Sequence, residues 1–505
     1  MRTIIPGPPG TGKTYRLVNH YLNIELNKNK VDGKKILYVS FSKAATQEAK
    51  KRIYDLYPMC EVQVSTLHAL GVKHLNLDTN NNLLKGKAWE NFKLYCGVDV
   101  NIDGIENETG MRQYKDYRMR VIEYANNKMI SLEEAQEELG LQDRTDLHDI
   151  KQIKLDLKTY KEEFKMFEYS DMIKQFVENR CSPTLDVIFL DEAQDLSPLQ
   201  WQMFFQLESL CERSYIAGDD DQAIYSFQGA DPKNFINLKG VIDAQTKSMR
   251  VPLNIHKEAE LILDNISKRM LKGWSPREGI GKVEYIVDLS NLNLNTGTWF
   301  ILARSKAVIY PIIQYLESTG YRFDCKYKTI LDRGLLRAWR TWDRLNQGAS
   351  VTSDDAFNLY EKCIRKEHVK HGFSNGKSLK EVDSVTIEEL KKDHGLLVEG
   401  DWNQLHMTEE QKIYIKELID RGEDLHEDAK IKLSTIHGVK GEEADNVVIY
   451  TDMEKIIYDS ARATEMHLDT EHRVWFVAVT RAKQNLYITS LDSKYNQYNI
   501  GGHII

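Results

Sequence analysis

Residues 2–14 read RTIIPGPPGTGKT, a short apolar run followed at once by a glycine-rich turn. Within it, residues 7–14 satisfy the phosphate-loop pattern G-x-x-x-x-G-K-S/T. Glycines let backbone amides approach phosphate oxygens, and the helix that follows adds the positive end of its dipole. We expect Lys13 to reach the β and γ phosphates and the Thr14 hydroxyl to bind magnesium. The predicted nucleotide-binding loop is Gly7, Pro8, Pro9, Gly10, Thr11, Gly12, Lys13 and Thr14.

A second stretch, DVIFLDEAQD at 186–195, is an apolar strand that ends in adjacent acids. Open α/β sheets bind ligands at the carboxyl ends of their strands. We expect Asp191 to hold the magnesium ion and Glu192 to polarise the attacking water, because two neighbouring acids need a cation or a proton between them. An acidic turn after a strand is common by itself. Together with a phosphate loop it indicates a nucleoside triphosphatase.

Further apolar runs extend this pattern along the chain. Those at 2–6, 35–41, 186–190 and 214–217 predict one parallel sheet, and those at 283–287, 299–302, 446–450 and 486–489 predict a second. Two segments, about 75–165 and about 330–428, have helical spacing instead, as in 130–141 and 335–345. We expect Trp339 and Trp342, in the latter, to be core residues. The fold class is therefore α/β, with two tandem sheets and two mainly helical insertions.

Composition sets the remaining limits. The 505 residues are 41% hydrophobic and 29% charged, which is typical of a soluble protein of three or four domains. The net charge of -8 means that contact with a polyanion must come from a local groove. The six cysteines contain no CxxC pair, so we expect reduced core thiols and no zinc or iron–sulfur site. Without a signal segment or a run of about 20 apolar residues, we expect the protein in the cytoplasm.

Four motifs, which follow one another in a fixed order, indicate a resemblance to a known protein family. They are DEAQD at 191–195, AGDDDQAIYSFQGA at 217–230, STIHGVKGEEADNVVI at 434–449 and EHRVWFVAVTRAKQNLYIT at 471–489. In these motifs the chain resembles the superfamily 1 DNA helicases of the UvrD, Rep and PcrA group. The resemblance implies two RecA-like domains of the phosphate-loop class, with ATP and Mg²⁺ as cofactors. The domains implied are 1A (1–74 and 166–247), its insertion 1B (75–165), 2A (248–329 and 429–505) and its insertion 2B (330–428).

The resemblance also implies roles for single residues. Gln222 would sense the γ phosphate, Arg250 in KSMRVP and Arg481 in VTRAK would be arginine fingers, and Glu443 would lie near the ribose and γ phosphate. Each finger would neutralise charge on the transferred phosphoryl group. Aromatic rings and hydroxyls on nearby loops would hold DNA without reading its sequence. The DNA-binding residues implied are Phe41, Ser42, Thr66, His68, Tyr225, Phe227, Thr435 and His437.

The chain departs from the family pattern in three features. Only five residues precede Pro6, so we expect no N-terminal glutamine motif for adenine. The arginine and tyrosine that sandwich adenine in the family are Tyr15 and Met249 here, and our hypothesis is that these two stack the base loosely, with weak discrimination among nucleotides. The arginine that follows the aromatic residue of the third motif is Gln228.

The function implied is an ATP-driven motor that moves 3′ to 5′ on single-stranded DNA and unwinds duplexes. Its partners would be single strands and junctions with duplex, with no membrane, and it would act as a monomer; a protein loading partner stays open. Two alternatives remain: a translocase or protein-displacing motor with little unwinding alone, and a phosphate-loop ATPase that acts on protein. Stimulation of hydrolysis by single-stranded DNA, and the salt dependence of binding, separate them. The pathway, whether repair, replication, recombination or defence, is left open.

Overall fold

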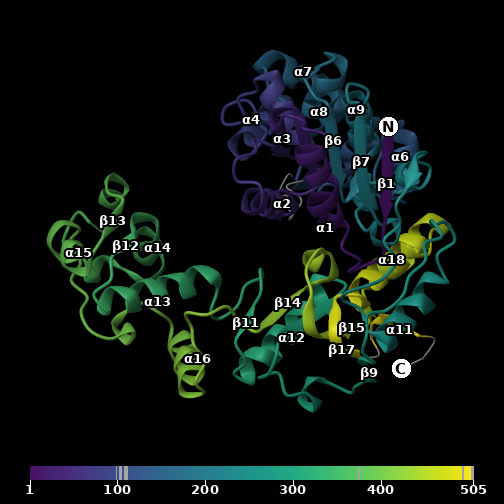
Figure 1. Ribbon diagram of the computed structural model, residues 1–505. Helices are drawn as coiled ribbons and strands as arrows, with labels where there is room; N and C mark the ends of the chain where they lie inside the picture. The colour runs from purple at the N-terminus through teal and green to yellow at the C-terminus, as the bar shows by residue number, and fades with distance from the viewer. Residues whose placement is uncertain (98, 102–104, 107–111, 374–375, 492–493, 502–505) are drawn as a thin grey trace.

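The computed structural model describes residues 1–97, 99–101, 105–106, 112–373, 376–491 and 494–501. Two six-stranded sheets form its centre, and within each sheet every pairing is parallel (Figure 1). Helices pack against both sheets, as parallel sheets require because both of their faces are apolar. The predicted fold class, two RecA-like α/β domains, is confirmed.

The first sheet has the order β3-β2-β6-β7-β1-β8. Its strands are β1 (Arg2–Pro6), β2 (Ile36–Ser40), β3 (Gln63–Ser65), β6 (Val187–Asp191), β7 (Arg213–Gly218) and β8 (Val241–Ile242). The four predicted strands are the four central ones. β3 and β8, at the edges, were not predicted because they are only three and two residues long. Only β7 separates β1 from β6, so the phosphate loop and the acids leave the same edge of the sheet.

The second sheet has the order β11-β14-β10-β15-β17-β9. Its strands are β9 (Lys282–Tyr285), β10 (Trp299–Ala303), β11 (Phe323–Asp324), β14 (Ile431–Thr435), β15 (Ala444–Tyr450) and β17 (Ala482–Thr489). The prediction missed β14, which reads IKLST, because Lys432 and Ser434 interrupt the apolar run. It also missed the short β11. A small antiparallel pair follows the last strands of this sheet in the chain: β16 (Asp452–Met453) comes after β15, and β18 (Asn496–Gln497) comes after β17.

Helices connect the strands of both sheets. In the first unit they are α1 (Lys13–Tyr15), continued by the π-helical turns η1 (Arg16–Leu22) and η2 (Ile24–Lys28), then α2 (Lys43–Leu56), α3 (Leu67–Leu75), α8 (Tyr169–Glu178), α9 (Pro198–Glu208) and α10 (Lys233–Ile236). In the second unit they are α11 (Leu253–Leu263), α12 (Lys306–Ser318), α17 (Lys455–Ala461) and α18 (Glu465–Val479). One hydrophobic cluster includes residues of both units, from Ile4 to Ile500.

The first insertion has its own core. It contains α4 (Lys87–Cys96), β4 (Ile105–Glu106), β5 (Arg112–Gln113), α5 (Tyr117–Lys128), α6 (Leu132–Glu138) and α7 (Leu147–Phe164). The helix predicted at 130–141 is the shorter α6, because Ser131 and Glu134 form a capping box that fixes its start.

The second insertion also has its own core, and Figure 1 shows it standing apart from the two sheets. It contains α13 (Arg333–Asn346), β12 (Val351–Thr352), α14 (Ser353–Cys363), β13 (Ser384–Val385), α15 (Ile387–Asp393) and α16 (Glu409–Asp420). Trp339 and Trp342 of α13 are buried in this core, as predicted.

The six cysteines are free thiols, which agrees with the prediction of reduced side chains. Only Cys325 and Cys363 are buried; the other four are half-buried, so the expectation of core positions holds for two of them. Among the residues that the structure describes, no helix combines the length and the apolar character needed to cross a lipid bilayer.

Candidate nucleotide site and nucleic-acid interface

The phosphate loop is held in shape by its glycines and by its own polar groups. Gly10 and Gly12 have φ values of 72° and 81°, a backbone region that favours glycine. A Cβ atom on Gly10 would lie 2.5 Å from Cβ of Arg250, so this position also needs glycine for the close approach of that segment. Lys13 is buried, and its Nζ donates to the Gly7 carbonyl at 2.8 Å. The ammonium group therefore lies inside the loop, where it would meet phosphate oxygens.

The acids at the end of β6 lie next to the loop. Oδ2 of Asp191 accepts hydrogen bonds from the Thr14 hydroxyl at 2.7 Å and from the Tyr38 hydroxyl at 2.9 Å. Burial, and then the charge of Glu192, raise the pKa of Asp191 to about 6. An acid in this state gains from a nearby cation, and the hydroxyl and carboxylate oxygens of Thr14 and Asp191 are the hard ligands that Mg²⁺ prefers. These two residues therefore fit the predicted metal.

Glu192 is the residue on which the charges of both sheet units converge. Its backbone has φ 55°, an uncommon value for a residue other than glycine. Burial alone would raise its pKa, but the charges of Lys440, Lys13 and Arg481 outweigh this effect and lower the pKa. Its Oε2 also accepts a hydrogen bond from Nε2 of Gln194 at 2.5 Å. Glu192 is thus kept ionised, as a residue that polarises water must be.

Arg481 reaches from the second sheet unit to the first. It lies just before β17 and is buried, and its Nη2 donates to Oε1 of Gln222 at 2.9 Å. Gln222 is in the 3-10 turn η5 (Asp220–Gln222) that follows β7. Burial, and then the charge of Arg250, lower the pKa of Arg481 to about 9, so its guanidinium is still charged at neutral pH. Two predicted residues from motifs about 260 positions apart are therefore in direct contact.

Arg250 is tied to the phosphate loop by the residues before it. Oγ of Ser248 donates to the Pro9 carbonyl at 2.9 Å, and the backbone N–H of Met249 donates to the Gly10 carbonyl at 2.8 Å. The guanidinium itself pairs with Glu443, with Nε and Oε2 2.5 Å apart. The two predicted residues Arg250 and Glu443 therefore lie together beside the loop.

The two residues proposed to stack the base are both exposed, Tyr15 by 62% and Met249 by 75%. Tyr15 directly follows the loop in α1, and Met249 is bonded to it through its backbone. The next arginine, Arg16, does not replace the family's stacking arginine here, since its Nε pairs with Oδ2 of Asp243 at 2.8 Å.

Sequence reasoning missed Lys440 and Asp195, which join the two sheet units. Nζ of Lys440 lies 2.6 and 2.5 Å from the two carboxylate oxygens of Asp195 and 2.7 Å from the Gln222 carbonyl. Burial raises the pKa of Asp195 to about 7, although the charge of Lys440 opposes this shift. Asp195 is the last residue of the motif DEAQD, and Lys440 lies in the motif STIHGVKGEEADNVVI. Their place in these two motifs could therefore have identified them as site residues.

A second missed group surrounds Lys272. Asp219, Asp220 and Asp221 are the one described group of acids with the spacing of a metal site, but the Lys272 ammonium sits among them. Its Nζ is 2.7 Å from Oδ1 of Asp219 and 3.0 Å from Oδ2 of Asp221. Asp219 in turn accepts from Nε2 of Gln222 at 2.6 Å. A chain of contacts therefore runs from Lys272 through Asp219 and Gln222 to Arg481.

Four of the predicted DNA-contacting residues form a row of rings across both units. Ring centres of Phe41 and Tyr225 are 5.4 Å apart, those of Tyr225 and Phe227 are 6.3 Å apart, and those of Phe227 and His437 are 5.6 Å apart. Nζ of Lys440 lies 4.8 Å from the Tyr225 ring centre. We call Phe41, Tyr225, Phe227 and His437 the aromatic row. Lys440 connects this row to the nucleotide site.

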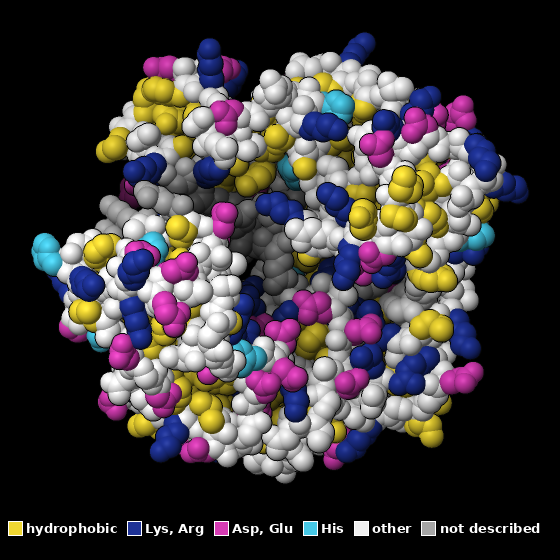
Figure 2. All heavy atoms as spheres, turned by 60° about the vertical axis from the view of Figure 1, so that its left-hand side comes forward, with side chains coloured by type: hydrophobic (Ala, Val, Ile, Leu, Met, Phe, Trp, Pro, Cys, Tyr) yellow, Lys and Arg dark blue, Asp and Glu magenta, His cyan; other side chains and the backbone are white. Residues whose placement is uncertain are grey.

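The other four predicted DNA contacts lie at or next to helix starts. Ser42 and Thr66 cap α2 and α3, accepting hydrogen bonds from the N–H groups of Ala45 and Ala69. His68 packs edge-on against Tyr169, and burial followed by the charge of Lys43 lowers its pKa to about 4. Thr435 ends β14. Figure 2 shows a hollow in this face of the molecule, with both basic (Lys and Arg) and acidic (Asp and Glu) side chains around it.

The third-motif position that departs from the family is buried. The Gln228 side-chain amide has no hydrogen-bond partner among the described residues, while its backbone carbonyl accepts from Nδ2 of Asn127 at 3.0 Å. Asn127 and Lys128 are the last two residues of α5 in the first insertion, and Lys128 pairs with Asp231. This segment of the third motif therefore contacts the first insertion.

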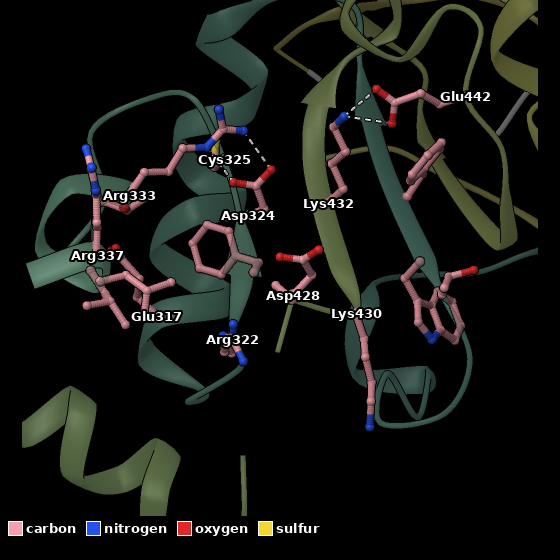
Figure 3. Close-up of a pocket in the computed structure, with 18 of the residues that line it drawn as sticks. Glu317, Arg322, Asp324, Cys325, Arg333, Arg337, Asp428, Lys430, Lys432 and Glu442 are labelled. Atoms are coloured by element: carbon pink, nitrogen blue, oxygen red, sulfur yellow. Dashed lines mark hydrogen bonds and ion pairs between the residues drawn. The ribbon is translucent and has the colours of Figure 1, made fainter. Parts of the chain in front are cut away.

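A separate cavity of about 650 Å³ lies where the second sheet meets its insertion (Figure 3). Two pairs of charged side chains in its lining are bonded to each other: Arg333 with Asp324 at 2.7 Å and Lys432 with Glu442 at 2.6 Å. Of the predicted site residues, only Glu443 lines it. No residue of the phosphate loop lines this cavity.

Comparison with known proteins agrees with this geometry. A family model described as the UvrD/REP helicase N-terminal domain matches residues 2–242. A probable DNA helicase II homolog of Rickettsia conorii is 23% identical over 610 residues, covering 97% of this chain and 90% of that protein. The ATP-dependent DNA helicase PcrA of Staphylococcus epidermidis is 22% identical over 609 residues, covering 97% of this chain and 81% of that protein.

A third relative, the ATP-dependent DNA helicase Rep of Buchnera aphidicola subsp. Schizaphis graminum, is 25% identical over 314 residues, covering 56% of this chain and 45% of that protein. The first two alignments are longer than this chain, so those relatives carry segments that it lacks. The matched model, the relatives and the two-sheet site together make this chain similar to the UvrD/Rep/PcrA-like helicases of superfamily 1.

Proposed function

We propose that this protein hydrolyses ATP with Mg²⁺ to move 3′ to 5′ along single-stranded DNA and to separate duplex ahead of it. The observation that carries the proposal is the contact of Arg481, from the second sheet unit, with Gln222 of the first, while Arg481 and Lys13 both act on Glu192. A site completed by both units couples hydrolysis to their relative motion.

The residues at this site divide the chemistry among them. Glu192 orients and polarises the water that attacks the γ phosphorus, and the bond to the oxygen that bridges the β and γ phosphates breaks, which leaves ADP and phosphate. Lys13, Arg250 and Arg481 neutralise the charge that spreads over the transferred group. When bound, Mg²⁺ supplies further charge neutralisation, with Thr14 and Asp191 as its holders.

Coupling to DNA is proposed to run through Lys440. Its ammonium touches Asp195 and the Gln222 carbonyl on one side and lies over the Tyr225 ring on the other. Separation of the sheet units breaks these contacts and changes the grip of the aromatic row, so closing and opening would advance the strand. Separating one base-pair step costs about 1.4 kcal/mol, a modest load for one hydrolysis.

The test is hydrolysis and unwinding by the purified chain, with Lys13→Ala as the inactive control. We expect single-stranded DNA to stimulate hydrolysis, and unwinding of duplexes with a 3′ tail in preference to those with a 5′ tail or an RNA strand. Preference for the 5′ tail would reverse the polarity. Stimulated hydrolysis without strand separation would indicate a translocase, and hydrolysis indifferent to DNA would overturn the proposal.

We further propose that Tyr15 and Met249 hold the base loosely, because both side chains are exposed. Rates with GTP should therefore approach those with ATP, since neither side chain forms hydrogen bonds that read the edge of a purine. GTP hydrolysis slower by more than about a hundredfold would contradict this loose-stacking proposal. Monomeric action in the cytoplasm is part of the same proposal.

A further inference from the structure

The cavity of about 650 Å³ in Figure 3 lies at the two connections that join the second insertion to the second sheet. Thr329 and Leu331 line it from the outgoing connection, between β11 and α13. Asp428, Ala429 and Lys430 line it from the returning connection, between α16 and β14. Pockets for small ligands have volumes of this size. A ligand in this junction cavity would contact both the sheet unit and the insertion.

Arg322, directly before β11, brings a buried charge to the cavity wall. The residue is 6% exposed and forms no ion pair among the described residues. Its Nη1 and Nη2 donate to the carbonyls of Asp424 and Glu427, whereas its Nε has no hydrogen-bond partner in the described part of the chain. Burial, and then the charge of Arg340, lower the pKa of Arg322. Because buried charges are normally paired, this guanidinium favours an anion.

Arg340, on α13 of the insertion, brings a second charge to the same wall. Its Nε donates to the Leu425 carbonyl, and its Nη2 donates to the Glu427 carbonyl that Arg322 also bonds. Within the described ranges it has no acidic partner either. Two guanidinium groups from different units therefore share one neutral oxygen. Like charges at such a separation repel each other, and an anion beside both of them would offset this repulsion.

The remaining charges of the lining leave a positive excess. Lys430 is exposed, and its Nζ makes only a long bond of 3.4 Å to the Asn295 carbonyl. Of the two acids without an ion pair among the described residues, Glu317 accepts from the N–H of Ile330, and burial raises its pKa. Asp428 is the other. The remaining charged groups of the lining pair elsewhere: Arg333 with Asp324, Lys432 with Glu442, Arg337 with Asp355 and Glu443 with Arg250.

Aromatic side chains supply the apolar part of the wall. Trp299, Phe300, Phe323 and Tyr414 all line the cavity, and Phe323 is only half-buried. Guanidinium groups bind phosphate oxygens through parallel N–H donors, and aromatic rings pack against flat apolar bodies. The wall therefore suits a molecule that has a phosphate at one end and a flat ring at the other.

We propose that the junction cavity is a second small-molecule site, which binds a phosphate monoester with a flat ring, of the nucleoside monophosphate class. Arg322, Arg340 and Lys430 hold the phosphate, and the aromatic side chains pack against the base. The phosphate loop is suited to a different ligand, because Lys13 there is placed for β and γ phosphates, which a monophosphate lacks. The bound ligand also ties the insertion to the sheet unit. This site does not depend on whether the chain moves along DNA.

The experiment is calorimetric titration of the full chain with guanosine 5′-monophosphate (GMP), without other nucleotide. Arg340→Gln and Lys430→Gln should each weaken GMP binding by about tenfold or more, since each removes a charged contact with the phosphate. Lys13→Ala should leave GMP binding unchanged. A titration with ATP should give the opposite pattern, with a loss in Lys13→Ala and none in the two cavity variants.

Two controls separate ligand contacts from support of the fold. Arg421 also donates to backbone carbonyls at this junction, those of Thr319 and Gly320, but it does not line the cavity. Arg421→Gln should therefore bind GMP as the unaltered chain does. Lys430 is exposed, so its variant keeps the test valid even if Arg340→Gln is unstable.

Other phosphates test the ring, and proteolysis tests the tie between the units. Glucose 6-phosphate and inorganic phosphate lack a flat aromatic ring, so they should bind about tenfold or more weakly than GMP. Lys328 is exposed in the outgoing connection. Saturating GMP should slow tryptic cleavage after Lys328 in the unaltered chain but not in Arg340→Gln.

Each contrary outcome overturns a stated part of the proposal. No binding of GMP, or binding that only Lys13→Ala removes, would overturn the site. A loss in Arg421→Gln as large as in Arg340→Gln would show that these arginines only support the fold, which would also overturn it. Equal affinity for inorganic phosphate and GMP would overturn the nucleoside class, and unchanged cleavage after Lys328 would overturn the tie.

Discussion

The nucleotide site and the aromatic row are built on opposite principles, although Lys440 touches both. At the nucleotide site, buried charged groups meet fixed partners at hydrogen-bond distance, as in the pairs Arg481 with Gln222 and Lys272 with Asp219. In the aromatic row, rings lie 5.4 to 6.4 Å apart and Phe227 is 38% exposed. Phosphoryl transfer needs exact placement of charge, whereas a moving strand needs contacts that any base can enter and leave.

The largest effect is expected from Glu192→Gln, which tests the nucleotide site, where the charges must hold fixed positions. The amide cannot polarise water as a carboxylate does, so DNA-stimulated hydrolysis should fall by about 10²- to 10⁴-fold. Strand affinity should persist, because Glu192 does not belong to the aromatic row. Steady-state hydrolysis and anisotropy on the same preparation check this. A loss of DNA binding as large as the loss of hydrolysis would contradict the separation of the two regions.

The next effect concerns the charges that join the sheet units. Lys272→Met leaves three buried aspartates without their shared cation, which should cost about 3 to 5 kcal/mol of stability. Hydrolysis should fall as well, because Asp219 positions Gln222. Chemical denaturation followed by tryptophan fluorescence measures the loss, and the exposed Lys268→Met is the matched control. Equal stability of the two variants would mean that the buried cluster contributes nothing.

A pH effect follows from Asp195, whose pKa is raised from 3.8 to about 7 in the folded chain. A group that holds its proton more tightly when folded stabilises most below its unfolded pKa, and this contribution is lost as the pH rises through the folded value. Stability should therefore fall by a few kcal/mol between about pH 4 and pH 7. Asp195→Asn should flatten that part of the melting-temperature profile. An unaltered slope in this variant would assign the effect to another group.

The smallest effect is expected in the aromatic row. Phe227→Leu keeps an apolar side chain but loses the ring, so affinity for single strands should fall by about 1 kcal/mol, roughly fivefold. Titration of labelled strands measures it, with Tyr54→Leu as a surface control. A loss of a hundredfold or more would show that the row depends on a few fixed contacts, which would remove the contrast with the nucleotide site.

Much of the fold was readable because its signals are local. A short apolar run and the glycine-rich turn after it identify β1 and the loop, and runs of four or more consecutive apolar residues identify β2, β6 and β10. β14 escaped because Lys432 and Ser434 alternate with its apolar residues, and only its neighbours β10 and β11 make it a strand of the sheet.

The candidate site divides in the same way. Lys13, Asp191 and Glu192 follow from the chemistry of their own segments, and Arg481 and Gln222 came from a family pattern. Lys272 lies in KRMLKGW, a segment without a recognisable motif. Its partner Asp219 is about 50 positions away in the chain, so the local sequence does not reveal the pairing. The sequence did not predict the buried hydroxyl of Ser305 either, because only the structure shows that it has no hydrogen-bond partner among the described residues.

The bonds from Ser248 and Met249 to the carbonyls of Pro9 and Gly10 have a mechanical consequence. They fasten the connection between the two sheets to the phosphate loop, so any rotation of one sheet unit against the other would pivot next to the proposed nucleotide site. A small rotation about this point displaces atoms in proportion to their distance from it. The second insertion, which stands apart from the two sheets, would then move farther than the sheets for each molecule of ATP hydrolysed.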